Sequence, residues 1–173
     1  MSFDIDGSLE KHAKRKRMFN PIDKHVQYDR DFIETLLPHR GPMLLLDESV
    51  AVDMEAQNIE GKRTLHAHDQ AFNGHFPGRP IYPGVLQIEM SGQLGLCLGV
   101  LLLREMENNP QAAFDIRLWK VHKALFCSEI KAGDEVSVLA SVLEDTGSTL
   151  ACAGQLIVNG EVASFSIVEA VIV

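Results

Sequence analysis

Two residues in one short stretch have the types and the spacing that proton-transfer chemistry requires. His75 stands in a loop rich in glycine and proline, and Glu89 follows 14 residues later in an apolar run. A histidine can take and return a proton near neutral pH. Because glycines and prolines specify the path of the backbone tightly, this loop should hold His75 rigidly. We therefore expect His75 to act as a general base.

Glu89 is expected to be the second participant, because its surroundings are unusual for a carboxylate. Its neighbours one helical turn away are mostly apolar or small: Val85, Leu86, Gly92 and Gln93. A carboxyl group there should be partly desolvated, which raises its pKa and suits a proton donor. Gln93 could hold this carboxyl group in place. The alternative is structural: a core histidine bonded to a carbonyl group, with Glu89 facing solvent.

The amino end of the same run offers a third group. Gly84 and Val85 should begin a helix, where backbone N–H groups lack partners and the helix dipole is positive. These N–H groups could stabilise an oxyanion such as a thioester enolate. A base, an acid and an oxyanion site together indicate an elimination enzyme, which removes a proton next to a carbonyl group and expels hydroxide as water.

The element that carries these groups should be a long buried helix. Residues 85–107 have helical length and are apolar nearly all round, which is typical of a central core helix. Ser91, Gly95 and Gly99 recur at every fourth position along it, and Gly92 lies beside them. Small residues cost helix propensity, so this stripe indicates that another backbone packs closely against it.

The remaining segments indicate an α+β architecture in which an antiparallel sheet covers the helix. The dipeptide Asn159–Gly160 lies between two alternating apolar runs and is a strong signal for a two-residue hairpin. Besides the long helix, we expect a short amphipathic helix at 31–37 and strands at 42–53, 58–68, 114–126, 134–145, 148–158 and 161–173.

The beginning of the chain differs from the rest. Residues 1–27 are polar and charged, with a basic cluster at 11–17. We expect a solvated or disordered tail there, with a docking element as the alternative. Residues 28–173 are expected to form a single domain that holds the candidate site.

Composition and charge exclude several classes of protein. The net charge of −8 argues against a nucleic-acid binder. The chain opens without an apolar segment of signal-peptide length, and the longest apolar stretch, Leu94–Leu103, is too short to span a bilayer. We therefore expect a cytoplasmic protein that binds neither nucleic acid nor membrane. Cys97, Cys127 and Cys152 lie in apolar runs and are expected to be buried, reduced thiols.

Other histidines are expected to have structural roles. His66 and His68 alternate on one strand face beside Asp69, which suggests a metal site at first sight. No cysteine cluster or further acid at ligand spacing supports that interpretation, so no metal is expected. His39 lies in a turn, where we expect a hydrogen bond to the backbone.

Two longer segments resemble a known family. The sequences LPHRGPMLLLDE (37–48) and GHFPGRPIYPGVLQIEMSGQ (74–93) resemble the β-hydroxyacyl-acyl carrier protein dehydratases of type II fatty acid synthesis, and FCSEIKAGDEV (126–136) resembles a later strand and turn of that family. The resemblance covers roughly residues 30–173. It implies a hot-dog fold, in which an antiparallel sheet wraps a long central helix. It also implies a homodimer at least, with a trimer of dimers as the further option.

The resemblance implies a role for each candidate. His75 would act as the base at the α-carbon, Glu89 would hold or protonate the departing hydroxyl, and the N–H of Gly84 would receive the thioester carbonyl. Substrates would arrive on the phosphopantetheine arm of acyl carrier protein, and no metal or diffusible cofactor is implied. Glu89 stands where the dehydratase–isomerase branch has aspartate, which favours dehydration to a trans-2-enoyl product without isomerisation.

An acidic carrier protein should dock on basic residues near the mouth of the acyl tunnel, and Arg79, Lys120 and Lys123 are the candidates. Two rival functions are a hot-dog thioesterase, which would attack the thioester with water, and a catalytically silent hot-dog subunit that binds acyl chains.

The sequence departs from the family pattern at two positions and in its long tail. Arg117 stands where the family often has a tyrosine that gates the tunnel, and Glu48 replaces a usual arginine. These departures suggest a polyketide-like or polyene pathway as an alternative to housekeeping fatty acid synthesis.

Overall fold

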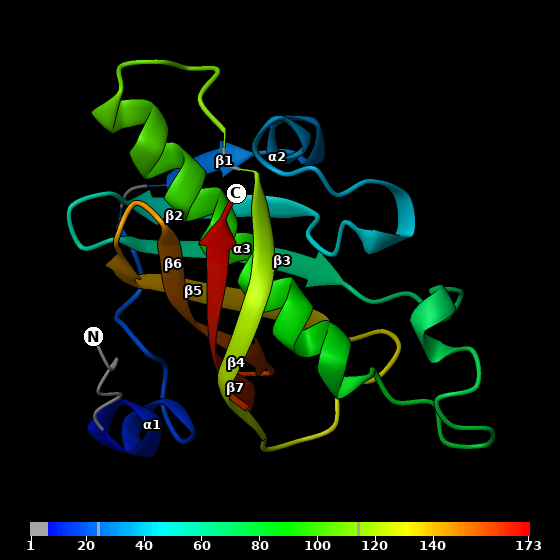
Figure 1. Ribbon diagram of the computed structural model, residues 1–173. Coiled ribbons are helices and arrows are strands. Elements are labelled where there is room, and N and C mark those ends of the chain that lie inside the picture. Colours follow the sequence, from blue (N-terminus) through cyan, green and yellow to red (C-terminus); the bar gives the residue numbers. More distant parts are fainter. Residues whose placement is uncertain (1–6, 24, 114) are drawn as a thin grey trace.

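Within residues 7–23, 25–113 and 115–173, which the computed structural model describes, a seven-stranded antiparallel sheet wraps around one long helix (Figure 1). The helices are α1 (Gly7–Ala13), α2 (Arg30–Leu36) and α3 (Gly84–Met106), with 3₁₀ turns at Gly41–Met43 and Gln70–Phe72. The strands are β1 (His25–Tyr28), β2 (Glu48–Asp53), β3 (Asn58–Thr64), β4 (Ile116–Phe126), β5 (Glu135–Asp145), β6 (Thr149–Val158) and β7 (Glu161–Ile172). They lie in the order β1-β2-β3-β5-β6-β7-β4, so that β4 forms an edge beside β7.

The strongest sequence signals are confirmed, and the weaker strand boundaries are wrong. The helix expected at 85–107 is α3, and Val158 pairs with Glu161 across the expected two-residue turn. Both turn residues have positive φ, as a type I′ hairpin requires. By contrast, β2 begins only at Glu48, although a strand was expected from residue 42, and β1 was not expected.

The segment before β2 is buried without being a strand. Leu44, Leu45 and Leu46 lie in the core, and the N–H of Leu45 donates to the side-chain oxygen of Gln93 at 2.9 Å. A side chain of α3 thus accepts a hydrogen bond that a neighbouring strand would otherwise accept. An apolar run alone could not distinguish these two arrangements.

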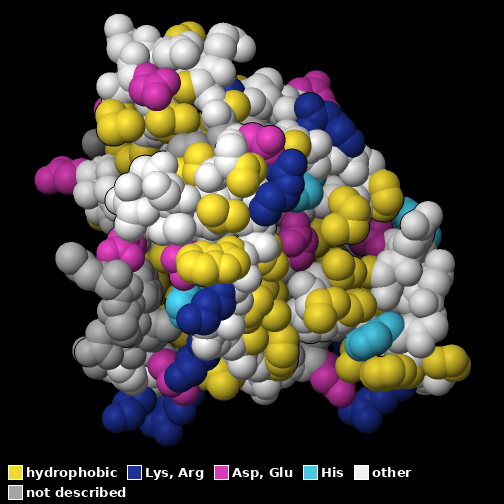
Figure 2. Space-filling view, in the orientation of Figure 1, with side chains coloured by type: hydrophobic (Ala, Val, Ile, Leu, Met, Phe, Trp, Pro, Cys, Tyr) yellow, Lys and Arg dark blue, Asp and Glu magenta, His cyan; other side chains and the backbone are white. Residues whose placement is uncertain are grey.

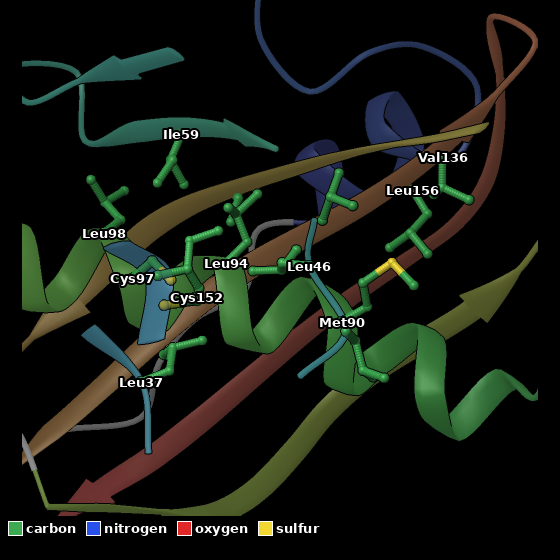
Figure 3. Close-up of a cluster of buried hydrophobic side chains, with 14 of the residues drawn as sticks. Leu37, Leu46, Ile59, Met90, Leu94, Cys97, Leu98, Val136, Cys152 and Leu156 are labelled. Atoms are coloured by element: carbon green, nitrogen blue, oxygen red, sulfur yellow. The ribbon is translucent and has the colours of Figure 1, made fainter. Parts of the chain in front are cut away.

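The core lies between α3 and the facing side of the sheet. Figure 3 shows the α3 side chains Met90, Leu94, Cys97 and Leu98 in one cluster with side chains from β3, β5 and β6. The small-residue stripe of α3 lies against β6, as expected. A Cβ atom built on Gly95 would lie 2.9 Å from Cβ of Cys152, and one built on Gly154 would overlap the side chain of Ser91.

By length and composition α3 could also cross a membrane, which the Leu94–Leu103 stretch alone did not indicate. The helix has 23 residues and a mean hydropathy of 1.5. However, 61% of that window is buried inside the molecule, as is usual for the core helix of a soluble protein.

The other face of the sheet is covered by residues 7–23, which we call the N-terminal arm. Successive strand residues point to opposite faces, and Ala153, Phe165 and Ile167 form a second buried cluster with Ala13 of the arm. The buried side chain of Gln155 accepts from the N–H of Met18 and donates to the carbonyl groups of Ala13 and Lys16. The expectation of a solvated tail is therefore wrong for residues 7–23. Of the rest of that expected tail, residues 1–6 and 24 lie outside the described part of the chain, and residues 25–27 belong to β1.

The cysteines differ in exposure. Cys97 and Cys152 are buried, and burial raises the pKa of both thiols, that of Cys152 to about 12. Cys127 is exposed, so the expectation of a third buried thiol is wrong. It directly follows β4, at the point where the chain leaves the sheet.

Candidate active site

His75 lies in a loop whose backbone closes on itself. The N–H of Ile81 donates to the carbonyl oxygen of His75 at 2.9 Å, and residues 76–79 form a tight turn with hydrogen bonds in both directions. Gly74 and Gly78 have φ values of +83° and +78°, a region that favours glycine. The glycines of the motif therefore give the chain the reversal that presents the histidine ring.

One ring nitrogen of His75 is already engaged. Nδ1 lies 3.0 Å from the carbonyl oxygen of Ile81. Since a carbonyl group only accepts, Nδ1 carries the hydrogen, and Nε2 of the neutral ring keeps its lone pair. The structural alternative anticipated a carbonyl bond of this kind, but the bond occupies only one of the two nitrogens. The half-buried ring thus has the tautomer that a general base needs.

The start of α3 lies in the same cavity as His75. Gly84 is the first helical residue, and the first N–H groups of a helix have no intrahelical acceptor. His75, Gly84 and Val85 line one open cavity of about 570 Å³. A Cβ atom on Gly84 would lie 2.8 Å from the ring of Phe126, so a larger residue there would displace this wall of the cavity.

Glu89 is held by two side chains from different parts of the chain. Its Oε1 accepts a hydrogen bond from Nε2 of Gln93 at 2.8 Å and lies 3.2 Å from Nε2 of His39. The hydrogen bond with His39 is the main reason why the pKa of Glu89 is lowered. Burial opposes this effect, and Gln93 adds to it.

The expected rise in the pKa of Glu89 is therefore wrong. Burial does raise this pKa, but the contact with His39, which is distant in the sequence, lowers it by more. The backbone role expected for His39 is also wrong, since its ring contacts the carboxylate. His39 comes from the loop after α2, and no spacing rule relates it to a glutamate 50 residues later. Its presence in the LPHRGP segment was the one available signal.

Gln93 connects this carboxylate to the buried segment before β2. The side-chain amide of Gln93 donates to Glu89 and to the carbonyl oxygen of Met43 at 2.7 Å, and its oxygen accepts from the N–H of Leu45. Every polar atom of this buried amide thus has a partner. The arrangement fixes the orientation of Gln93 and, through it, that of Glu89.

Within one chain, the base and the carboxylate open into different cavities. Glu89, His39 and Gln93 line a second cavity of about 290 Å³ together with Arg117 and apolar side chains of β6 and β7. The two cavities share no lining residue. A single chain therefore unites His75 with the helix start, and Glu89 with Gln93, but does not unite the two pairs.

The three docking candidates differ in their surroundings. Arg79 forms an ion pair with Glu129 at 2.6 Å beside the His75 cavity, and Lys123 forms an ion pair with Glu10 of the N-terminal arm. Lys120 has no ion pair with any described residue. Two of the three positive charges are thus already compensated within the chain.

His66 and His68 do not form a metal site with the other described residues. The rings of His66 and His68 stack with their centroids 5.3 Å apart. Asp69 instead accepts from Arg63 and from the N–H of His66. Among the described residues, no group of three or more potential ligands is arranged to hold a metal ion.

Comparisons with solved structures show the fold. The dehydratase heterocomplex ApeI:P from Xenorhabdus doucetiae is similar with a TM-score of 0.67 and 18% identity, over 82% of this chain and 90% of that one. The PaaI protein of E. coli, from the phenylacetic acid degradation operon, has a TM-score of 0.52 and 14% identity over 75% and 80% of the two chains. The hot-dog fold implied by the sequence resemblance is thereby confirmed.

Comparisons of sequence show the family. Residues 37–166 match the FabA-like domain. The 3-hydroxyacyl-[acyl-carrier-protein] dehydratase FabZ of a Nitratiruptor species is 33% identical over 144 residues, which are 82% of this chain and 95% of the relative. FabZ of Xanthomonas campestris pv. campestris is 34% identical over 148 residues, or 85% and 93%. The chain therefore belongs to the FabA-like family and is related over most of its length to FabZ dehydratases.

Proposed function

We propose that this protein dehydrates 3-hydroxyacyl groups on acyl carrier protein to trans-2-enoyl groups, in fatty acid synthesis or a related polyketide or polyene pathway. The observation that carries the proposal is that His75, whose Nδ1 bonds to a carbonyl group and leaves Nε2 available, lines one cavity with the start of α3. The names of the FabZ relatives supply the substrate class.

In the proposed reaction, His75 and the helix start act on the same end of the substrate. Nε2 of His75 takes the proton from the α-carbon, and the N–H of Gly84 donates to the thioester oxygen as negative charge develops there. The Val85 N–H lies at the same helix end and adds to the positive potential. The C–O bond at the β-carbon then breaks as the double bond forms.

Glu89 is proposed to act on the departing hydroxyl group. Because its pKa is lowered, the carboxylate is ionised at neutral pH and orients the hydroxyl by accepting its O–H hydrogen. The proton taken by His75 ends on the departing oxygen, so that water leaves and both residues return to their initial states. Gln93 and His39 keep the carboxylate in position.

We further propose that two chains share each site, in a homodimer at least. The support is the separation of the two cavities within one chain, together with the edge strand β4, which exposes large apolar side chains: Leu118, Trp119 and Val121. A second chain that covers this edge could bring its Glu89 to the His75 of the first. The proposed location is the cytoplasm, and no metal or diffusible cofactor takes part.

The experiment is mass spectrometry of 3-hydroxyacyl carrier proteins of several chain lengths after incubation with the enzyme. Loss of the mass of one water, with the acyl group still attached, is the expected result. A free carrier thiol would instead indicate a thioesterase. An unchanged substrate at every chain length would contradict the proposal. The position of the double bond in the product tests the expected lack of isomerisation.

A further inference from the structure

The N-terminal arm carries a basic cluster that the sheet holds in a fixed place. Lys11, Lys14, Arg15 and Lys16 are exposed or half-exposed, and none forms an ion pair with a carboxylate of the described residues. Gln155 binds the backbone of the arm on either side of Lys14 and Arg15, at the carbonyl groups of Ala13 and Lys16. The cluster is therefore positioned by buried contacts, unlike the charges of a free tail.

This cluster lies beside the cavity that contains His75. The carbonyl oxygen of Lys14 lies 3.8 Å from Sγ of Cys127, and Cys127 lines that cavity together with His75 and Gly84. Figure 1 shows α1 at the same end of the sheet as the loop that follows β4. Figure 2 shows Lys and Arg side chains gathered at the lower left of the molecule, in the part of the view where Figure 1 places α1.

The arm also changes the charge of the face around it. Its Glu10 neutralises Lys123, one of the docking candidates on β4. Residues 11–17 of the arm contain five of the 16 Lys and Arg residues of the chain and no carboxylate. Of these, Arg17 forms an ion pair with Glu60. The other four form none with a described carboxylate, although the charges of Lys11 and Lys14 also act on Glu10. The remainder of a chain with net charge −8 would repel an acidic partner.

We propose that the N-terminal arm is the surface on which the acidic carrier protein docks to deliver its acyl group to the His75 cavity. This inference rests on the proposed function, because that function supplies the acidic partner. The match to the FabA-like domain begins only at residue 37, so the arm adds a docking element outside the matched domain. Charge complementarity close to the cavity speeds encounter and orients the partner.

The test uses the full-length protein with Lys14→Gln, Arg15→Gln and Lys16→Gln combined. Two quantities are measured: the Kd for a 3-hydroxyacyl carrier protein, and kcat/KM for the same acyl group on N-acetylcysteamine. Rim charges contribute modestly one by one, so we expect carrier binding to weaken about tenfold in the triple variant. Turnover of the small thioester should be unchanged, because it does not contact the arm.

A matched pair of single variants controls for the loss of charge. Arg15→Gln should weaken carrier binding about threefold. Lys62→Gln removes a charge on β3 that lies 3.9 Å from Glu135, far from the arm in sequence, and should leave carrier binding unchanged. Added salt should weaken carrier binding of the wild type more than that of the triple variant.

Each outcome separates the inference from the proposed function. Unchanged carrier binding in the triple variant, or equal weakening by Lys62→Gln, overturns the docking surface. The same holds if the variant loses binding to RNA or to anionic vesicles while it keeps carrier binding. If the triple variant alone loses carrier binding but the wild type dehydrates neither substrate, the docking surface stands and the proposed function fails.

Discussion

Removal of the His39 ring should change both the pKa of Glu89 and the rate of dehydration. In His39→Ala, Glu89 keeps its hydrogen bond from Gln93 and loses its contact with His39, the main cause of its lowered pKa. Nδ1 of His39 is buried without a partner in the described part of the chain, so the substitution breaks no other hydrogen bond of the ring. The effect should therefore arise at Glu89.

The size of the shift follows from the exposure of the pair. Hydrogen bonds to charged groups contribute about 1.5–3 kcal/mol. The two side chains are 27% and 29% exposed, which favours the lower part of that range. The ionised form of Glu89 should thus lose about 1.5 kcal/mol of stabilisation in His39→Ala, and its pKa should rise.

The sign for stability follows from the direction of the shift. Because the pKa of Glu89 is lower in the folded than in the unfolded chain, its ionised form stabilises the fold above the unfolded value. This stabilisation is lost as the pH falls through the folded value. The rate is compared at a pH where NMR shows the carboxylate ionised in both proteins, so any loss of rate there reflects its position. We expect kcat to fall about tenfold.

The pKa is measured by ¹³C NMR of glutamate-labelled protein, with Glu89→Gln to identify the resonance. His39→Gln places a neutral donor near the former Nε2 and should recover part of kcat, whereas His68→Gln, at an exposed position, should change neither quantity. An unchanged or lower pKa of Glu89 in His39→Ala would refute the assigned cause. A normal kcat with a raised pKa would refute the positioning role.

Four further outcomes are expected. His75→Ala should fold normally and lower kcat by ~10²–10⁴-fold in the assay with small thioesters, and near-normal turnover would exclude His75 as the base. An equal mixture of His75→Ala and Glu89→Ala chains should regain about a quarter of wild-type activity after subunit exchange. The reason is that about half of the dimers are mixed, and each mixed dimer has one intact site of two. Zero recovery, with exchange verified by mass spectrometry, would argue against a shared site. Dialysis against a strong chelator should leave activity intact, and loss that Zn²⁺ restores would contradict this. Gly154→Ala should lower the free energy of unfolding by about 1–3 kcal/mol in denaturant titrations, since its Cβ would meet Ser91, whereas Gly7→Ala, with open space around it, should have little effect.

The parts of the fold that could be predicted from the sequence are those with local signals. The length and apolar character of α3 do not depend on distant residues, and Asn159–Gly160 sets the β6–β7 hairpin by its own backbone preferences. The stripe at Ser91 and Gly95 predicted a close backbone, because small residues in a helix need a packing reason.

The parts that could not be predicted depend on contacts between distant segments. Three apolar side chains of the arm are scattered among charged ones: Leu9, Ala13 and Met18. They form no recognisable pattern in the sequence, and they are buried or partly buried only because they pack against Phe165 and Ile167 on the outer face of the sheet. The near-continuous burial of β6 has the same origin, since the arm covers one of its faces and α3 the other.

In the candidate site, too, the features with local sequence signals were predicted, and those that depend on distant residues were not. His75 and Gly84 lie nine residues apart, and a rigid loop brings them to one cavity, as their types and spacing indicated. The environment of Glu89 was misjudged because His39 reaches it through the tertiary fold. A pKa depends on every charged or polar neighbour in space, and sequence neighbours are a minority of these.

The three hydrogen bonds of Gln155 also constrain how this chain can evolve. They run to backbone atoms of the arm, so they are insensitive to which side chains the arm carries. The arm can therefore change its surface residues, and with them its binding preference, while its attachment is inherited intact. A relative that lost the arm would expose a row of apolar side chains and an amide without partners, so selection should then replace Gln155 and its neighbours with residues suited to solvent. Glutamine at this position and an N-terminal arm should thus be gained and lost together.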